Sequence, residues 1–128
     1  MDTSQNNSKS INIDKHHELR DRTKSFALRV IRMSDALPRT RAGNVIANQI
    51  LRSATGMSAN YRAAGRSRSK PEFIAKIGVV IEEADETVFW LEMLRDSGII
   101  KPVKLDRMLD EANQLLAIFT ASRRTAKS

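Results

Sequence analysis

Apolar residues recur at intervals of three, four and seven along four segments of this chain, and this spacing constrains the fold most. It matches the period of an α-helix, where such residues share one face. The segments are residues 14–36, 40–64, 69–98 and 103–123. No alternating pattern of the kind typical of a strand lasts more than a few residues. The chain is therefore predicted to be all-α.

The ends of the predicted helices carry recognisable signals. Pro38 supports a stop after the first segment, because the residue before a proline avoids the helical region. Ser69 is a suitable N-cap for the third segment, Pro71 suits its first turn, and Gly98 suits its end. Helices of about 20 residues joined by short loops must run antiparallel to their neighbours. An antiparallel, up-down-up-down four-helix bundle over residues 14–123 is the predicted architecture.

Length and composition indicate a single domain with short ends outside the bundle. A chain of 128 residues fits one domain. The polar residues 1–13 are typical of a disordered N-terminal tail, and residues 124–128 are predicted to form a basic C-terminal tail. The chain has no cysteine, no run of about 18 apolar residues and no secretion signal. We therefore expect a cytoplasmic protein that makes no contact with a membrane.

The positive charge of the chain is unevenly distributed. The net charge is +7. Residues 1–71 hold 14 Lys/Arg and 5 Asp/Glu, a net +9, whereas residues 72–128 hold 8 and 10, a net −2. Such asymmetry favours a nucleic acid, an anionic surface or an acidic partner. A basic helix face that is merely solvated is the alternative.

The strongest candidate for anion binding lies where the second helix ends. Four cations with no acid among them follow one another within nine residues, and they could clamp phosphates. They are Arg62, Arg66, Arg68 and Lys70. Arg39 and Arg41 lie at the opposite end of the second helix and would extend this footprint along its length. A solvated loop is again the alternative.

A second group of polar residues lies next to the apolar stripes. Arg52 could reach Glu83 or Glu86 across an antiparallel bundle, and the pattern does not say which of the two it meets. Asn60 is a poor helix former, which indicates a compensating hydrogen bond to another helix. We interpret these four residues as a structural polar network: a partly buried ion pair that fixes the helix register, together with the Asn60 contact. A polar binding site in the bundle is the alternative.

Catalytic and metal-binding patterns are not found in the sequence. His16 and His17 are the only histidines. Neighbouring residues point about 100° apart on a helix, so the two form a poor chelate. No Glu-x-x-His pair of the kind used by di-iron bundles occurs. We predict a protein that is not an enzyme and that uses no metal or other cofactor.

The stretch from Gln49 to Leu94 resembles a known family. It contains Ser58-Ala59-Asn60, the basic turn after Arg62, and Trp90-Leu91-Glu92-Met93-Leu94. It is similar to the four-helix bundle proteins encoded by intervening sequences inside bacterial 23S rRNA genes, the S23 ribosomal proteins. Many members carry Glu-Gly or Glu-Ala after the small-Ala-Asn element. This chain has Ala63-Ala64 there, so no role that rests on that acid can be transferred.

The resemblance implies a homo-oligomer, a pentamer being the expected form. The accessory proteins of diversity-generating retroelements have a similar architecture, which implies RNA or DNA, and a reverse transcriptase, as partners. A ring of basic chains would attract polyanions. The alternative is a protein–protein scaffold with no nucleic-acid role. Several apolar residues fall outside the four core stripes and indicate a subunit interface: Ile31, Val45, Val79, Phe89, Trp90 and Met93.

Overall fold

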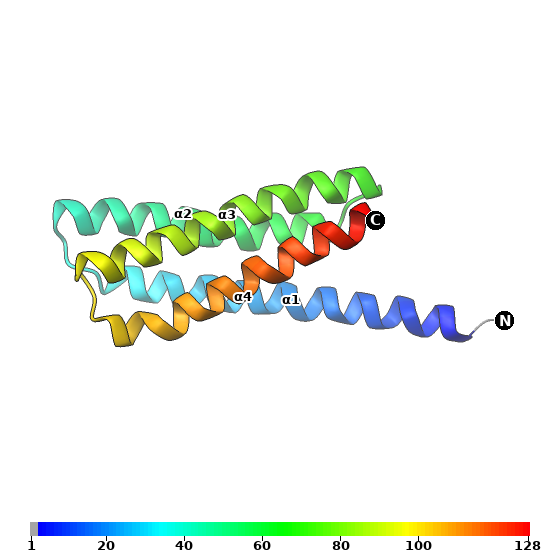
Figure 1. The fold of residues 1–128 in the computed structure, drawn as a ribbon, viewed down its shortest axis with the longest axis horizontal. Coiled ribbons are helices and arrows are strands. Elements are labelled where there is room, and N and C mark those ends of the chain that lie inside the picture. Colours follow the sequence, from blue (N-terminus) through cyan, green and yellow to red (C-terminus); the bar gives the residue numbers. More distant parts are fainter. Residues whose placement is uncertain (1–2) are drawn as a thin grey trace.

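The chain folds into four helices that run alternately up and down (Figure 1). The computed structural model describes the backbone of residues 3–128 and the side chains of residues 14–128. The helices are α1 (Thr3–Asp35), α2 (Arg41–Ala64), α3 (Lys70–Ser97) and α4 (Pro102–Lys127). The predicted all-α, four-helix architecture is confirmed. No helix among the described residues is long and apolar enough to span a membrane.

Two helix ends differ from the sequence prediction. The backbone of α1 is helical from Thr3, whereas the composition had indicated a disordered tail over residues 1–13. Met1 and Asp2, and the side chains of 1–13, lie outside the described residues. At the other end of the chain, α4 continues to Lys127. The predicted basic tail therefore forms the last turn of a helix, where cations interact favourably with the helix dipole.

The remaining helix boundaries follow local chemistry. The Thr40 side chain accepts a hydrogen bond from the Gly43 amide at the start of α2. Ser69 accepts one from the Glu72 amide at the start of α3, as its predicted role as an N-cap requires. Gly98 ends α3 with φ 76°, a left-handed conformation that glycine adopts without a steric cost. The three links between helices are consequently short.

The core is formed by the apolar stripes that the sequence shows. Phe26, Ile77, Leu91 and Phe119 are fully buried. The stripe of α2 is also buried and consists of Ile46, Ile50, Ala54, Met57, Tyr61 and Ala64. Between α2 and α3 the core also contains one polar pair. The Thr87 hydroxyl donates to Ser53 Oγ at 3.0 Å and lies 2.8 Å from the Glu83 carbonyl. This pair joins two helices within the apolar interior.

The contact between α1 and α4 differs from the other helix contacts. Close backbone packing joins α1 to α2, α2 to α3, and α3 to α4. Between α1 and α4, side chains make the connection: the carboxylate of Glu111 accepts from Arg29 and lies 3.5 Å from Arg22 Nε. Arg22 also donates to Gln114 at 2.7 Å. On the far side of this polar clasp, the N-terminal part of α1 and the C-terminal part of α4 diverge (Figure 1).

Candidate nucleic-acid interface

The turn between α2 and α3 lies at the same end of the bundle as the C-terminus of α4 (Figure 1). We call this the basic end. Arg66, Arg68 and Lys70, which the sequence predicted as phosphate contacts, are exposed there. The Lys70 amino group lies 3.4 Å from the carbonyl oxygen of Ser128, so the turn and the C-terminus of α4 are in contact. The structure therefore places the basic turn, through Lys70, next to the last turn of α4.

That last turn contributes cations which sequence reasoning did not assign to the site. Arg124 and Lys127 occupy the last turn of α4 and are exposed. Treating residues 124–128 as a tail left their position undefined. One sequence signal could have indicated them: no acid follows Glu111. Glu72 is the acid that follows the turn. Its carboxylate forms an ion pair with Lys76 at 3.0 Å and accepts a hydrogen bond from the Arg68 amide at 3.1 Å.

The other predicted contacts lie elsewhere. Arg62 is exposed on the side of α2 that faces α1, where it lines a hollow of about 590 Å³ together with Arg20 and Lys24. Arg39 and Arg41 are exposed at the opposite end of α2. The 24 residues of α2 separate them from the basic end by roughly 36 Å at 1.5 Å per residue. Arg39 and Arg41 thus lie apart from the basic end, as the sequence indicated.

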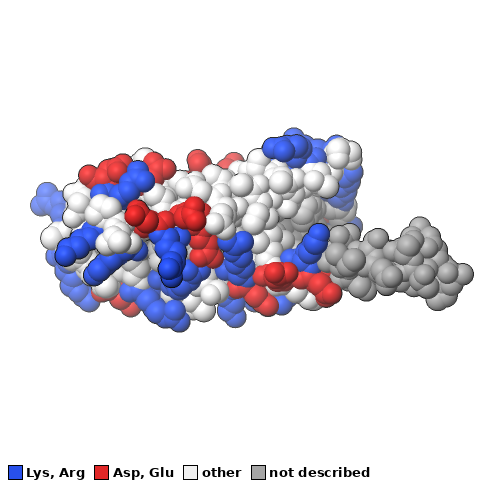
Figure 2. All heavy atoms as spheres, turned by 60° about the horizontal axis from the view of Figure 1, so that its bottom comes forward, with Lys and Arg blue, Asp and Glu red and all other residues white. Residues whose placement is uncertain are grey.

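The distribution of charge supports this division. On the face shown in Figure 2, Lys and Arg occur along much of the bundle, including both ends, and Asp and Glu lie among them. No acidic residue occurs between Asp35 and Glu72, so α2 and its two flanking links carry only positive formal charges. This stretch is the most uniformly basic part of the chain.

The predicted polar network is only partly assembled. Among the described residues, Arg52 makes no ion pair with Glu83 or Glu86, and Arg52 is exposed. Burial raises the pKa of Glu83 and Glu86 adds to this effect, while Arg52 opposes it. The charge of Arg52 thus acts on Glu83 from a distance, but the two side chains do not form a buried ion pair. An exposed arginine is better solvated by water than by a distant carboxylate.

Two further features of this network concern α2 itself. The Glu83 carboxylate covers Gly56, where a Cβ would lie 2.9 Å from Glu83 Oε2. The absence of a side chain at Gly56 therefore lets the Glu83 side chain of α3 lie close to α2. The predicted interhelical bond of Asn60 is wrong: its amide donates to the Gly56 carbonyl at 2.8 Å within α2. The Asn60 amide is thus satisfied by the backbone of its own helix.

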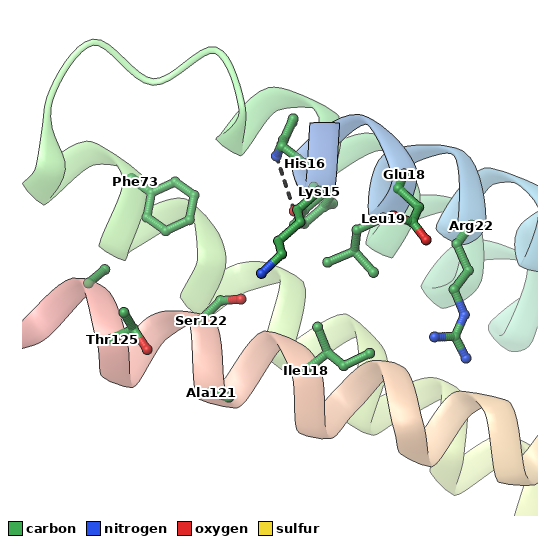
Figure 3. A pocket seen from close by; sticks show the side chains of 12 residues that line it. Lys15, His16, Glu18, Leu19, Arg22, Phe73, Ile118, Ala121, Ser122 and Thr125 are labelled. Carbon is green, nitrogen blue, oxygen red and sulfur yellow. Dashed lines mark hydrogen bonds between the residues drawn. The ribbon is translucent and has the colours of Figure 1, made fainter. Parts of the chain in front are cut away.

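His16 connects α1 to the basic end. Its Nδ1 lies 3.0 Å from the Tyr61 hydroxyl, and its ring stacks on the tyrosine ring at 4.8 Å (Figure 3). A side chain at Gly65 would collide with the His16 ring. Burial lowers the pKa of His16, and the nearby His17 and Arg20 lower it further. Burial also raises the pKa of Tyr61 to about 12. Both rings are therefore neutral near pH 7.

The possible metal ligands of the described residues are dispersed. Within the described residues, no three potential ligands among His, Cys, Asp and Glu come close enough to hold a metal ion. The Nδ1 atom of His16 is engaged by the Tyr61 hydroxyl. The site is best described as exposed cations on the end of a four-helix bundle.

The fold and the basic end define an antiparallel four-helix bundle with a candidate anion-binding surface. The model of the family described as 23S rRNA-intervening sequence protein matches residues 15–121, and the chain belongs to this family. The similarity inferred from residues 49–94 is thus confirmed. Among curated proteins, none matches this chain.

A solved structure with the same fold comes from Bacteroides thetaiotaomicron. It is described as a protein of unknown function from the S23 ribosomal protein family. It shares 27% sequence identity with this chain, and the TM-score is 0.79. The match covers 86% of this chain and 98% of the other. The bundle of this chain therefore spans nearly the whole of that relative.

Proposed function

We propose that the protein is a non-enzymatic, homo-oligomeric helical bundle that associates with RNA or DNA through phosphate contacts at its basic end. The observation that carries this proposal is the contact of Lys70 with Ser128, which places the basic turn next to the last turn of α4. Phosphate contacts of this kind are mainly electrostatic and carry little sequence information. The family description connects such proteins with the 23S rRNA gene, which makes rRNA a natural first ligand to test.

The test is an anisotropy titration with a structured rRNA fragment, a single strand and a duplex at several salt concentrations. Affinity should fall steeply with salt, because each neutralised phosphate releases counterions. Replacing Arg66, Arg68 and Lys70 by serine should weaken binding to all three ligands. For each phosphate that the variant no longer neutralises, the salt slope should become shallower by about 0.7 to 0.9. Circular dichroism should stay unchanged, because these side chains are exposed.

A matched control removes the same charge from the other end of the bundle. Lys101, Lys104 and Arg107 are exposed at the start of α4, and their triple serine variant should keep most of the affinity. Equal weakening by both triple variants would show that only net charge matters and would contradict the assignment to the basic end. No binding by the parent at about 0.15 M salt, where the Debye length is about 8 Å, would contradict the nucleic-acid proposal.

The second candidate function is a protein–protein scaffold without a nucleic-acid role. The observation in its favour is the exposure of large apolar side chains, among them Phe89 at 50% and Val45 at 51%. Exposed apolar residues in a group often mark a protein interface. Oligomers that form while all three nucleic-acid ligands fail to bind would support this candidate over the first.

A further inference from the structure

A hollow opens between α1 and α4 next to the basic end. Its volume is about 800 Å³. It exists because α1 and α4 diverge beyond the Glu111 clasp, and because the facing turns of α4 carry small residues. We call it the α1–α4 hollow. Its lining includes Leu19, Tyr61, Phe73, Ile118, Ala121 and Ser122.

The walls of the α1–α4 hollow combine flat apolar surfaces with polar groups. Leu19 from α1, Phe73 from α3 and Ile118 from α4 project towards the space between the helices (Figure 3). The Lys15 amino group and the Ser122 hydroxyl are directed into the same space (Figure 3). Apolar and aromatic walls accept the face of a nucleobase, and an amino group accepts a phosphate. An acyl chain would use the walls but leave these polar groups without a partner.

The surroundings of the hollow match a nucleic-acid strand. Arg124 and Lys127 flank the lining residues Thr125 and Ala126 on α4. A smaller hollow of about 340 Å³ shares His16 and Phe73 with the larger one and continues to Ser67 and Ser69 of the basic turn. The charged residues that line the α1–α4 hollow are Lys15, Arg22 and the acid Glu18, all on α1 (Figure 3). The cations of the basic end lie next to the hollow and do not line it. This arrangement offers room for a base with phosphate contacts on both sides.

We infer that the α1–α4 hollow binds the base of an unpaired nucleotide, while Lys15 and the cations of the basic end contact the phosphates of the same strand. This inference rests on the proposed function, since it names the kind of nucleic acid that the basic end recognises. A continuous duplex keeps its bases stacked and cannot reach the hollow. A strand with a bulged or single-stranded nucleotide can place one base there at a modest unstacking cost.

The first experiment compares two RNA hairpins that differ only in a single-nucleotide bulge. The parent protein should bind the bulged hairpin about tenfold more tightly, the equivalent of about 1.4 kcal/mol. Ala121→Leu should abolish this preference, because a larger side chain fills the hollow. The matched control is Ala117→Leu, which adds the same side chain at an exposed position of α4 that does not line the hollow. It should keep the preference.

The second experiment uses nucleoside monophosphates alone. Adenosine or uridine monophosphate at millimolar concentration should shift the methyl resonances of Leu19 and Ile118 in the parent and in Ala117→Leu, but not in Ala121→Leu. If the methyl resonances of the parent do not shift, the inference is overturned. This holds also when they fail to shift because a second copy of the chain covers the hollow.

The two proposals fail in different ways. Salt-dependent binding of both hairpins with equal affinity, or a preference that survives Ala121→Leu, would overturn the inference and leave the proposed function standing. No binding of either hairpin would contradict the proposed function, and the monophosphate titration would still decide whether the hollow accepts a nucleotide.

Discussion

At the scale of single residues, Glu83 is the most unusual ionisable group of the α2–α3 contact. Its carboxylate covers Gly56, its pKa is raised by burial and by Glu86, and Arg52 reduces that shift from a distance. The charged form of this partly buried acid is therefore disfavoured, and Arg52 offsets that effect only in part. This arrangement changes what a mutation of Arg52 should do.

The replacement Arg52→Ala should change the free energy of unfolding by less than about 1 kcal/mol, because an exposed cation contributes little to stability. The pKa of Glu83 should rise further when the nearby cation is removed. Urea unfolding and an NMR titration of Glu83 measure the two effects. A loss of about 3 kcal/mol or more, typical of a broken buried pair, would contradict the structure.

The His16–Tyr61 contact predicts a pH dependence of stability. Because the folded state lowers the pKa of His16, the unfolded state binds more protons below the unperturbed value of about 6.5. Stability should be complete above that pH, decrease as the pH falls towards the lowered value, and then level off. The groups that face His16 are His17, Arg20 and Tyr61, and none of them is an acid that would stabilise the protonated ring.

Thermal unfolding between about pH 7.5 and pH 5.5 tests this expectation. The melting temperature of the parent should fall as the pH is lowered over that range. The melting temperature of the His16→Gln variant should fall less. The control His17→Gln removes an exposed ring that makes no bond to Tyr61, and it should keep most of the pH dependence. Identical pH profiles for the parent and His16→Gln would assign the effect to other groups.

At the scale of secondary-structure elements, the buried Ser53–Thr87 contact fixes α2 against α3. Thr87→Val and Ser53→Ala should each cost about 1 kcal/mol, because each removes one partner of a buried hydrogen bond. The double variant should cost less than the two single variants together, with a coupling of about 0.5 kcal/mol or more.

Denaturant unfolding of the four proteins measures this cycle. The control is Thr120→Val, whose hydroxyl is exposed and bonds to the Leu116 carbonyl of its own helix. It should change stability by less than about 0.5 kcal/mol. Strictly additive effects of Ser53 and Thr87 would show that the two hydroxyls do not interact.

The elements themselves could be predicted because their signals are local. Periodicity, Ser69, Pro71 and Gly98 act within one or two turns, and the structure agrees with them. The buried hydroxyl pair could not be predicted, because serine and threonine in a helix can bond to their own backbone. The same competition explains Asn60, whose nearest acceptor lies one turn earlier in α2.

At the scale of the whole molecule, the exposed apolar residues predict self-association. Val79, Phe89 and Met93 are 40%, 50% and 41% exposed and lie within about a quarter-turn arc of α3. We expect an oligomer, most simply a ring, that buries this surface. Light scattering should give a mass that is a multiple of 14.4 kDa.

The double replacement of Phe89 and Met93 by serine should shift the mass towards the monomer on dilution. Val103→Ser is the control, since Val103 is 74% exposed at the far end of α4. A parent protein of 14.4 kDa at micromolar concentration would rule out stable assembly.

The candidate site was less predictable than the fold. The run of cations from Arg66 to Lys70 is contiguous in sequence, so it could be recognised directly. Its meeting with Arg124 and Lys127 depends on where α4 ends, and the composition had suggested a tail there. The α1–α4 hollow results from the divergence of two helices that are far apart in sequence, and no local pattern records such an angle.

The polar clasp at Glu111 has a consequence for the dynamics of the bundle. Helix α1 packs closely on α2 alone, and a carboxylate that is 17% exposed connects it to α4. Elements with few buried apolar contacts open before the whole protein unfolds. Amide hydrogens of α1 should therefore exchange with solvent faster than those of α2 and α3. The Glu111→Gln replacement should increase the exchange rate in α1 and leave the rates in α2 and α3 unchanged. Helix α1, which forms one wall of the α1–α4 hollow, is then also the part of the molecule that opens most readily.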